Sequence, residues 1–366
     1  MNLFRFLLAW RTIPLRDREV VDALVDPAHA SPSPELEDAL RTWPGTHYWS
    51  DEPDGRHIVF TRPNGPRPRE SWTMHAVLFA VTLFSTTAAG AMLAGALPAD
   101  PGIVMSPAAW NLGFFRAWSA GLSFSLPLLA ILLCHELGHY ITARRYQLDV
   151  SPPYFVPAPP PWLPIGTLGA FIRLRTIMTD RRQLIDVGAA GPIAGFVVAV
   201  PLLWIGLAHS HAMSMEGARG AQVALGSGFA VPLGDSLLTL LMRRLAGGAP
   251  AVMLHPTAFA AWFGVFVTNV NLLPIAQLDG GHVLYAALPR WQERIARVFW
   301  VFIMLLGWFW EGWWVFGIFV LVLSRGRLGH PPVLDAYRPL PPSRRRLAWG
   351  SLLLFAATFA PVPFRL

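Results

Sequence analysis

Long uncharged hydrophobic stretches alternate with short arginine-containing segments over most of the chain. A helix that crosses a bilayer needs about 20 consecutive apolar residues. The pattern therefore predicts an all-α multi-pass membrane protein with about six to seven transmembrane helices and a short strand-like loop associated with the membrane. The candidate spans are Met74–Leu97, Gly121–Ala143, Val187–Ala208, Pro256–Leu273, Arg297–Leu323 and Trp349–Phe364.

The number of spans depends on the stretch Arg297–Leu323. It is interrupted at Glu311-Gly312, and arginines flank it on both sides. Because loop arginines mark the cytosolic side of a membrane protein, we expect both ends of this stretch in the cytosol. The sequence therefore predicts a hairpin that turns near Glu311, with arms that are short for two full crossings.

The first 72 residues are polar and of mixed charge, unlike the remainder. Ser33-Pro34-Glu35 is a typical helix start and predicts a short helix through Leu40. The turn residues Pro53-Asp54-Gly55 precede a predicted strand, His57–Thr61. We expect two parts: an N-terminal segment, residues 1–72, and a membrane domain, residues 73–366.

The distribution of arginine predicts the orientation. Six arginines lie between the second and third candidate spans, whereas three lie between the third and fourth. The positive-inside bias puts the first of these loops in the cytosol, so the N-terminal segment is cytosolic as well. The expected location is the cell membrane.

The composition agrees with a membrane protein. The chain is 54% hydrophobic and 14% charged, with a mean hydropathy of +0.43. Soluble domains carry roughly 25% charged residues. The net charge of +7 does not indicate nucleic-acid binding, because the arginines fall mostly between apolar stretches, where they act as topology signals.

One candidate span carries a pattern of metal ligands, His135-Glu136-Leu137-Gly138-His139. Residues four apart share a helix face, so the two imidazoles can bind one zinc ion. Glu136 lies about 100° round the helix from His135, where it can reach a metal-bound water. Ionisable groups inside a membrane helix are costly and usually functional.

A catalytic zinc site needs a third protein ligand and an open position. Asp279 is a candidate, in a segment where Pro274 breaks a predicted span. An aspartate before two glycines is equally typical of a simple turn. Downstream of His139 the glutamates Glu216, Glu293 and Glu311 are the alternatives, and none lies in a ligand motif.

Taken together, the two motifs resemble the site-2 protease family of intramembrane zinc metallopeptidases. The family pattern combines a His-Glu-x-x-His membrane helix with a later Asn-x-x-Pro-x-x-x-Leu-Asp-Gly segment, and both are present, at His135–His139 and Asn271–Gly280. Gly166–Phe171 and Gly191–Gly195 also look like family features. The resemblance covers roughly residues 74–365, without an evident PDZ or CBS domain.

The resemblance implies a set of site residues and partners. His135, His139 and Asp279 would bind one Zn²⁺ per chain, Glu136 would be the general base, and Asn271 would contact the substrate or a developing oxyanion. Substrates would be transmembrane proteins in the lipid bilayer, cleaved in or near a membrane span. Neither the particular substrate nor the oligomeric state follows from the resemblance.

The residues around the motif suggest how a substrate reaches the site. About 7–8 Å of helix separates His139 from Arg144, so water can reach the metal from the cytosolic side. The strand-like Gly166–Leu174 could hold an unwound substrate by edge pairing. Gly191 and Gly195 form a small-residue face suited to close helix packing beside the site. His282 is expected as a neighbour of the ligands and not as a ligand itself. The loop histidines His209, His211 and His255 are expected to be solvated or to cap helices.

One alternative is a non-catalytic membrane protein that keeps a structural metal site and binds transmembrane helices. The intact Glu136 argues against this alternative, since a purely structural site has no need of a base. A second alternative is a metalloprotease of another family, with a glutamate as third ligand.

Overall fold

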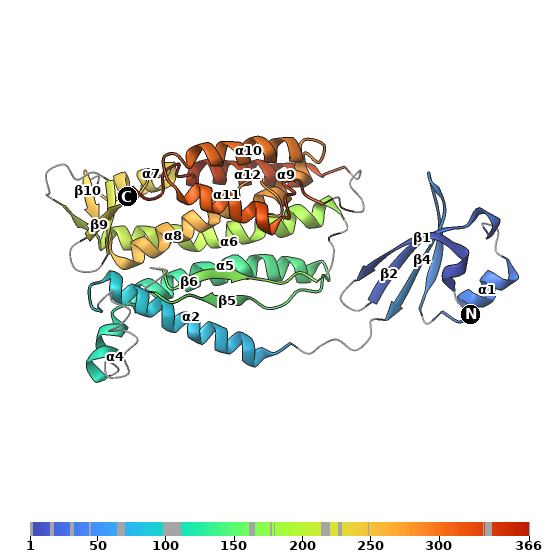
Figure 1. Cartoon of the computed structure of the whole chain (residues 1–366), viewed down its shortest axis with the longest axis horizontal. Helices are drawn as coiled ribbons and strands as arrows, with labels where there is room; N and C mark the ends of the chain where they lie inside the picture. Colours follow the sequence, from blue (N-terminus) through green and yellow to red (C-terminus); the bar gives the residue numbers. More distant parts are fainter. Residues whose placement is uncertain are drawn as a thin grey trace. The chain divides into compact units, whose positions relative to one another are not determined.

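The computed structural model describes most of the chain (Figure 1). The described residues are 3–14, 18–29, 33–43, 45–63, 70–97, 111–160, 165–175, 178, 180–213, 220–225, 229–247, 249–331, 333 and 339–365. They divide into two compact units, of which the first comprises Met1–Ser71, Ala143–Ser151 and Arg173–Met178. The second unit holds the remaining residues. The expected boundary after residue 72 and the cytosolic location of the N-terminal segment stay predictions.

The first unit is built on a four-stranded antiparallel sheet in the order β1-β2-β4-β3. Its elements are η1 (Leu3–Phe6), β1 (Leu7–Pro14), β2 (Arg18–Val25), η2 (Pro27–His29), α1 (Pro34–Arg41), β3 (His47–Glu52) and β4 (Gly55–Pro63). The predicted helix and strand are confirmed. The Ser33 side chain caps α1 by accepting from the Leu36 N–H. Leu36, Ile58 and Phe60 are buried together, so this unit has its own small hydrophobic core.

The second unit contains mostly helices. These are α2 (Trp72–Leu93), α4 (Leu112–Ser119), α5 (Leu122–Arg145), α6 (Arg181–Ala208), α7 (Leu237–Leu245), α8 (Pro256–Asn271), α9 (Asp279–Ala287), α10 (Gln292–Leu306), α11 (Gly312–Leu323) and α12 (Pro342–Thr358). Helix α6 packs against α8 and α9, and α12 also contacts α6 (Figure 1). The Asp180 side chain caps the N-terminus of α6 by accepting hydrogen bonds from the N–H groups of Arg182 and Gln183.

Two small sheets belong to the second unit as well. One is four-stranded, in the order β7-β10-β8-β9, and lies between α6 and α8 in the sequence. Its strands are β7 (His211–Ala212), β8 (Gly220–Leu225), β9 (Phe229–Pro232) and β10 (Ala251–Met253). The other is an antiparallel pair, β5 (Tyr154–Pro157) and β6 (Thr167–Phe171), which runs beside α2 and α5 (Figure 1).

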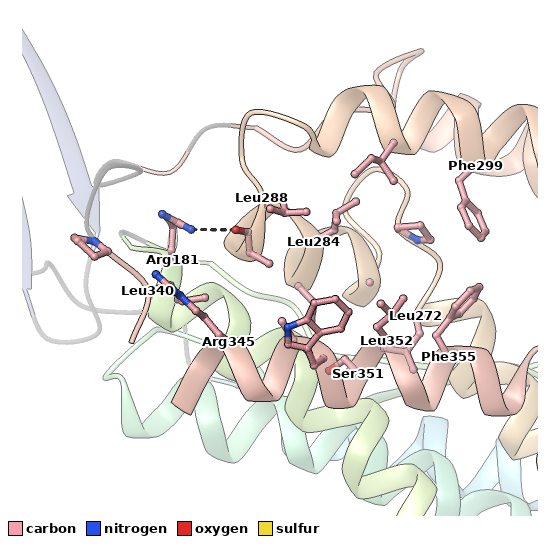
Figure 2. A pocket seen from close by; sticks show the side chains of 18 residues that line it. Arg181, Leu272, Leu284, Leu288, Phe299, Leu340, Arg345, Ser351, Leu352 and Phe355 are labelled. Carbon is pink, nitrogen blue, oxygen red and sulfur yellow. Dashed lines mark hydrogen bonds between the residues drawn. The ribbon is translucent and has the colours of Figure 1, made fainter. Parts of the chain in front are cut away.

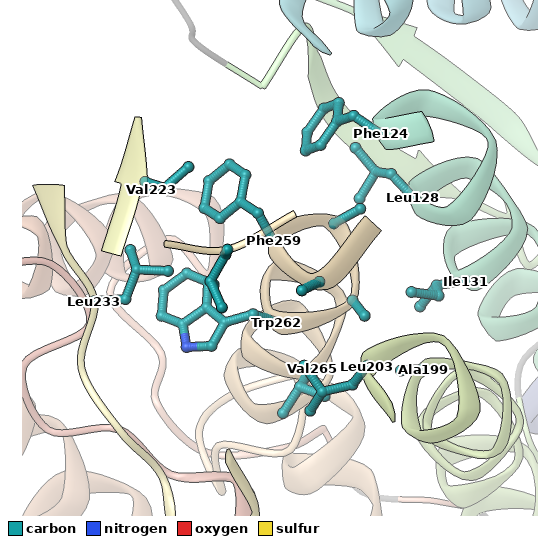
Figure 3. Packing of buried hydrophobic residues seen from close by; sticks show 14 of the residues in the cluster. Phe124, Leu128, Ile131, Ala199, Leu203, Val223, Leu233, Phe259, Trp262 and Val265 are labelled. Atoms are coloured by element: carbon teal, nitrogen blue, oxygen red, sulfur yellow. The ribbon is translucent and has the colours of Figure 1, made fainter. Parts of the chain in front are cut away.

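The main core of the second unit lies between α5, α6, α8 and the four-stranded sheet. Phe124 and Leu128 of α5 meet Phe259 and Trp262 of α8, and Leu203 comes from α6 (Figure 3). The Phe124 and Phe259 rings stack with their centroids 5.7 Å apart. This packing fixes the three helices that flank the candidate metal site.

The prediction of an all-α protein with six to seven spans is wrong. Among the described residues, three helices are long and apolar enough to cross a membrane, α2, α5 and α6, and the fold also contains three small sheets. The later stretches are divided into shorter helices: α8 has 16 residues and α11 has 12. Hydrophobicity alone did not separate a spanning helix from a shorter apolar helix that packs against the bundle.

The hairpin predicted near Glu311 is confirmed. Helix α10 ends at Leu306 and α11 begins at Gly312. Two indole N–H groups join the arms in antiparallel order: Trp300 donates to the Gly317 carbonyl at 3.0 Å, and Trp314 donates to the Met304 carbonyl at 2.8 Å. The tryptophans therefore hold the two short arms together.

Candidate metal centre

Three potential metal ligands meet inside the second unit. His135 and His139 lie one turn apart on α5, and Asp279 is the first residue of α9. The Nε2 atoms of the two histidines are 3.2 Å apart, and each is 3.3 Å from Oδ2 of Asp279. Both histidines are buried, and 15% of the Asp279 side chain is exposed. Residues 140 positions apart in the sequence thus form one compact group of donors.

The dimensions of this group fit a tetrahedral zinc ion. Zinc bonds to nitrogen and oxygen of about 2.0–2.1 Å, at tetrahedral angles, separate neighbouring ligand atoms by about 3.3 Å. The three observed separations, 3.2, 3.3 and 3.3 Å, form a triangle of this size. Two imidazole nitrogens and one carboxylate oxygen are ligands that zinc accepts, and three protein ligands leave a fourth position open. The residues present therefore fit the metal that the sequence predicts.

The orientation of the His139 ring is fixed from its far side. Its Nδ1 lies 2.7 Å from the carbonyl oxygen of Val187 on α6, so Nδ1–H donates and Nε2 keeps its lone pair for a metal. The ring lies against Gly191: a Cβ at position 191 would be 2.0 Å from His139 Nε2. The absence of a side chain at Gly138 lets α5 and α6 approach closely, because a Cβ at this position would lie 2.4 Å from the Ala190 carbonyl oxygen.

The small-residue face on α6 therefore does more than permit helix packing. Gly191 leaves the space that the His139 ring occupies, and Gly195 lies against His135, where an added Cβ would be 3.2 Å from the histidine Cβ. The sequence indicated close packing at these glycines. It placed this packing beside the site, but it did not show that the side chains in contact would be those of His135 and His139.

Glu136 lies beside the ligands and is 7% exposed. Ile172, which directly follows β6, has its backbone N–H close to this carboxylate. The β5–β6 hairpin is itself held to α2: Ser85 Oγ donates to the Gly166 carbonyl at 2.7 Å, and His75 Nδ1 is 3.0 Å from the Pro153 carbonyl. The end of β6 is thus fixed next to Glu136, a contact that the sequence did not predict.

Asn271 also reaches the group of ligands. It is the last residue of α8, and its Nδ2 lies 3.3 Å from His135 Nε2. The side-chain amide is therefore adjacent to the triangle of donors without being one of its corners. This location agrees with the polar contact that the sequence predicts for Asn271, although the predicted role itself is not tested by the geometry.

A compact loop brings Asp279 to α5. Ala276 adopts a left-handed conformation, with φ of 51°, and its N–H donates to the Leu328 carbonyl at 2.9 Å. A Cβ on Gly280 would lie 1.9 Å from the Leu272 carbonyl oxygen, and one on Gly281 would lie 2.3 Å from that of Ala276. The two glycines after Asp279 are therefore required by close backbone contacts, so the simple-turn interpretation of this segment is incomplete.

Two further histidines, His282 and His255, have hydrogen-bond partners outside the triangle. His282 Nδ1 is 2.7 Å from His330 Nε2, so its hydrogen-bond partner is another histidine and not one of the ligands. His255 caps α8 by accepting from the Thr257 N–H at 3.3 Å.

A second group with ligand chemistry lies in the first unit, formed by Asp22, Glu52 and His57. Both His57 nitrogens already face carboxylates: Nδ1 is 2.9 Å from Asp22, and Nε2 is 3.2 Å from Asp54. Arg11 donates to the other Asp22 oxygen at 3.0 Å. Asp22 and His57 are therefore already paired within the protein without a metal.

Comparisons with known proteins agree with this site. Residues 123–307, about half of the chain, match Peptidase family M50. The matched region contains every member of the proposed site. The chain therefore belongs to peptidase family M50, and the predicted membership of the site-2 protease family of zinc metallopeptidases is confirmed.

Curated relatives point to the same class. The chain is 29% identical over 320 residues to "Probable zinc metalloprotease EGY1, chloroplastic" of Arabidopsis thaliana, which covers 81% of this chain and 54% of the relative. The protein of the same name from Oryza sativa subsp. japonica is 30% identical over 238 residues, 62% of this chain and 39% of the relative. "Probable zinc metalloprotease EGY2, chloroplastic" of Arabidopsis thaliana is 28% identical over 247 residues, with 67% and 42% covered.

The chain thus spans about half the length of the first of these relatives and less of the other two. No solved structure matches the chain.

Proposed function

We propose that this membrane protein is an intramembrane zinc endopeptidase that hydrolyses a peptide bond in or near a transmembrane segment of its substrate. The observation that carries the proposal is the triangle of His135, His139 and Asp279, two corners of which lie on α5, a helix of membrane-spanning length. Glu136, a candidate base, is buried beside them.

The metal ligands would be His135, His139 and Asp279. When bound, zinc supplies a Lewis acid that polarises the scissile carbonyl and activates a water. The carbonyl of Val187 holds His139 so that Nε2 faces the donor atoms of His135 and Asp279, and Gly191 leaves room for the ring. These contacts preorganise the site before a substrate arrives.

Glu136 would transfer the proton of the attacking water. Its carboxylate takes a proton from the attacking water and later gives it to the nitrogen of the leaving amine. The backbone N–H of Ile172 lies next to this carboxylate. Asn271, with its amide next to His135, is positioned to contact the substrate or the oxygen on which negative charge develops.

The β5–β6 hairpin offers a way to bind the substrate as an extended strand. Among the described strands, β6 pairs with β5 alone, so its other edge is open to a further strand. The strand ends at Phe171, and the next residue, Ile172, contacts Glu136. A substrate segment unwound from its helix and paired along this edge would run towards the base.

The proposed orientation of the protein in the membrane rests on the distribution of its arginines. Arg144 and Arg145 end α5 about one and a half turns beyond His139. We therefore propose that the site opens to the cytosolic side of the cell membrane and that the N-terminal segment is cytosolic. Transmembrane proteins and the lipid bilayer are the partners that this arrangement needs.

The test uses detergent-purified full-length protein incubated with single-span membrane proteins, and it compares wild type with Glu136→Gln. We expect wild type to produce a cut that mass spectrometry maps to the membrane span or its border. The variant should keep its metal and lose the cut. Equal cleavage by the variant would overturn the role of Glu136, and cuts confined to soluble regions far from the span would overturn intramembrane cleavage.

The alternative, a structural metal site in a helix-binding protein, gives a different result. Such a protein would bind metal and would leave every single-span protein intact, in wild type as in the variant. A carboxylate buried beside the candidate ligands, which a purely structural metal site does not need, favours the peptidase.

A further inference from the structure

A large cavity lies against the loop that leads to Asp279. Its volume is about 710 Å³, and it is bounded by α9, α10 and α12, together with Leu272 and Pro274 of the loop (Figure 2). Gly280, which follows the third ligand, also lines it. The site described above does not use this space.

The lining is hydrophobic except at one end. Arg181 and Arg345 lie together there (Figure 2), and none of the 18 lining residues is acidic. The guanidinium of Arg181 donates to the carbonyls of Ala286 and Ala287 at 2.7 and 3.3 Å, so Arg181 is held in place at this end of the cavity. The hydroxyl of Ser351, a polar group within the apolar part, already donates to the Leu347 carbonyl at 3.0 Å. The apolar part of the cavity therefore favours a ligand segment that has no polar groups.

The cavity opens to the outside of the molecule along α12. Among its lining residues, Trp349 is 67% exposed, Leu352 is 52% exposed and Leu288 is 47% exposed. In a membrane protein such large apolar side chains face the bilayer. A ligand can therefore enter from the lipid phase with its polar end at the arginines.

We propose that this cavity binds one anionic phospholipid, with its acyl chain in the apolar part and its phosphate at Arg345 and Arg181. The volume lies within the range of about 300–1,000 Å³ that is usual for small-ligand sites. Basic pockets between membrane helices recognise anionic head groups. Arg344 does not compete for this role, because its guanidinium pairs with Asp186 at 2.9 Å.

A substrate helix fits the cavity less well. A helix with a diameter of about 10 Å would fill 710 Å³ with roughly 9 Å of its length, or about six residues. An extended peptide would need partners for its backbone groups, which the apolar lining does not supply. An acyl chain has no polar groups to satisfy, so the lipid is the better occupant.

The bound acyl chain would touch the loop that carries the third metal ligand. Leu272, Pro274 and Gly280 would contact the lipid, while Asp279 faces the histidines. The lipid would thereby restrict movement of the loop and hold Asp279 near α5.

Two matched pairs of variants test the proposal. Arg345→Gln removes a charge that lines the cavity, and Arg346→Gln removes an exposed neighbouring charge that does not. Ala348→Phe fills part of the cavity, whereas Ala356→Phe adds the same ring at an exposed position of α12 outside it. Binding is measured by native mass spectrometry of the full-length protein with phosphatidylglycerol, phosphatidylcholine, or glycerol 3-phosphate.

We expect one tightly retained phosphatidylglycerol on wild type, weaker retention of phosphatidylcholine, and none of glycerol 3-phosphate. An arginine near the membrane contributes about 1 kcal/mol to anionic lipid binding, so Arg345→Gln should lower retention about five-fold. Ala348→Phe should abolish it, and the two control variants should match wild type. Equal retention by all four variants, equal retention of both lipids, or binding of glycerol 3-phosphate alone would overturn the proposal. Because the readout is lipid bound and not peptide cleaved, the result stands apart from the proposed peptidase activity.

Discussion

Gly191→Ala offers a sharp test of how the candidate metal site is built. The added methyl group would lie 2.0 Å from His139 Nε2, 2.3 Å from Cδ2 and 2.5 Å from Cε1. An ordinary contact requires about 3.4 Å or more, so the ring would have to move by about 1.4 Å. Zinc ligands keep their distances within about 0.2 Å, and such a shift would take His139 out of coordination.

The expected loss of metal affinity is large. Removing a partner that only orients a ligand costs about 10–100-fold in affinity, so displacing the ligand itself should cost about 100-fold or more. The helix itself should tolerate the change, because alanine in a helix interior is about 1 kcal/mol more favourable than glycine. A folded protein without metal is therefore the expected result.

Two other glycines on helices provide the controls. A methyl group at Gly195 would lie 3.2 Å from His135 Cβ and needs only a few tenths of an ångström of adjustment, so Gly195→Ala should lose affinity modestly. Gly350 has no neighbouring atom within 4 Å of an added Cβ, and Gly350→Ala should bind metal like wild type. The assay is metal content by mass spectrometry under competition with a chelator, with size-exclusion chromatography as the check on folding. Wild-type affinity in Gly191→Ala would refute the observed packing of α6 on His139.

Three further predictions concern other parts of the molecule. Leu168→Pro removes a backbone N–H from β6 at a residue that has no partner on β5. If the substrate pairs along β6, this variant should keep its metal and cleave at least about ten-fold more slowly than Leu168→Ala. Equal cleavage rates of the two variants would exclude pairing along β6. Asn271→Ala should keep its metal and lower kcat by about ten-fold or more, which single-turnover kinetics can measure, and an unchanged kcat would remove Asn271 from the site. Burial lowers the pKa of His57, but the hydrogen bond and charge of Asp22 and the charges of nearby carboxylates outweigh this effect and raise it. Because the pKa is raised in the folded state, protonated His57 stabilises the first unit below pH about 6.5, and this stabilisation is lost as the pH rises through the folded pKa. Limited proteolysis of the full-length chain, compared with His57→Gln, should therefore show a greater resistance of wild type that shrinks with rising pH. A difference in resistance that does not change with pH would contradict the prediction.

The sequence predicted the chemistry of the site better than the shape of the fold. His135 and His139 are recognisable because a helix puts residues four apart on one face, and this local rule needs no knowledge of the tertiary structure. Asp279 is 140 residues away, and only its motif linked it to the histidines. The roles of Gly191 and Ile172 depend on which helix and strand pack against α5, and no local pattern encodes that packing.

The error in the fold has a similar origin. Pro256–Leu273 is as apolar as a membrane span, yet α8 ends at Asn271 after 16 residues because the loop to Asp279 begins there. Much of α8 is buried in the core against α5 and α6, and burial against protein requires the same apolar residues as burial in lipid. Among the strands of the two four-stranded sheets, only β4 was predicted, from the turn residues Pro53-Asp54-Gly55 that lead into it.

The most direct test of the central claim is the zinc content of the detergent-purified protein, measured for wild type, His139→Ala and Asp279→Ala. The account predicts about one zinc ion per chain in wild type and a sharp reduction in both variants, since each removes one corner of the same triangle of ligands. Zinc that stays bound after the loss of Asp279 would contradict the joining of the two distant motifs into one metal site.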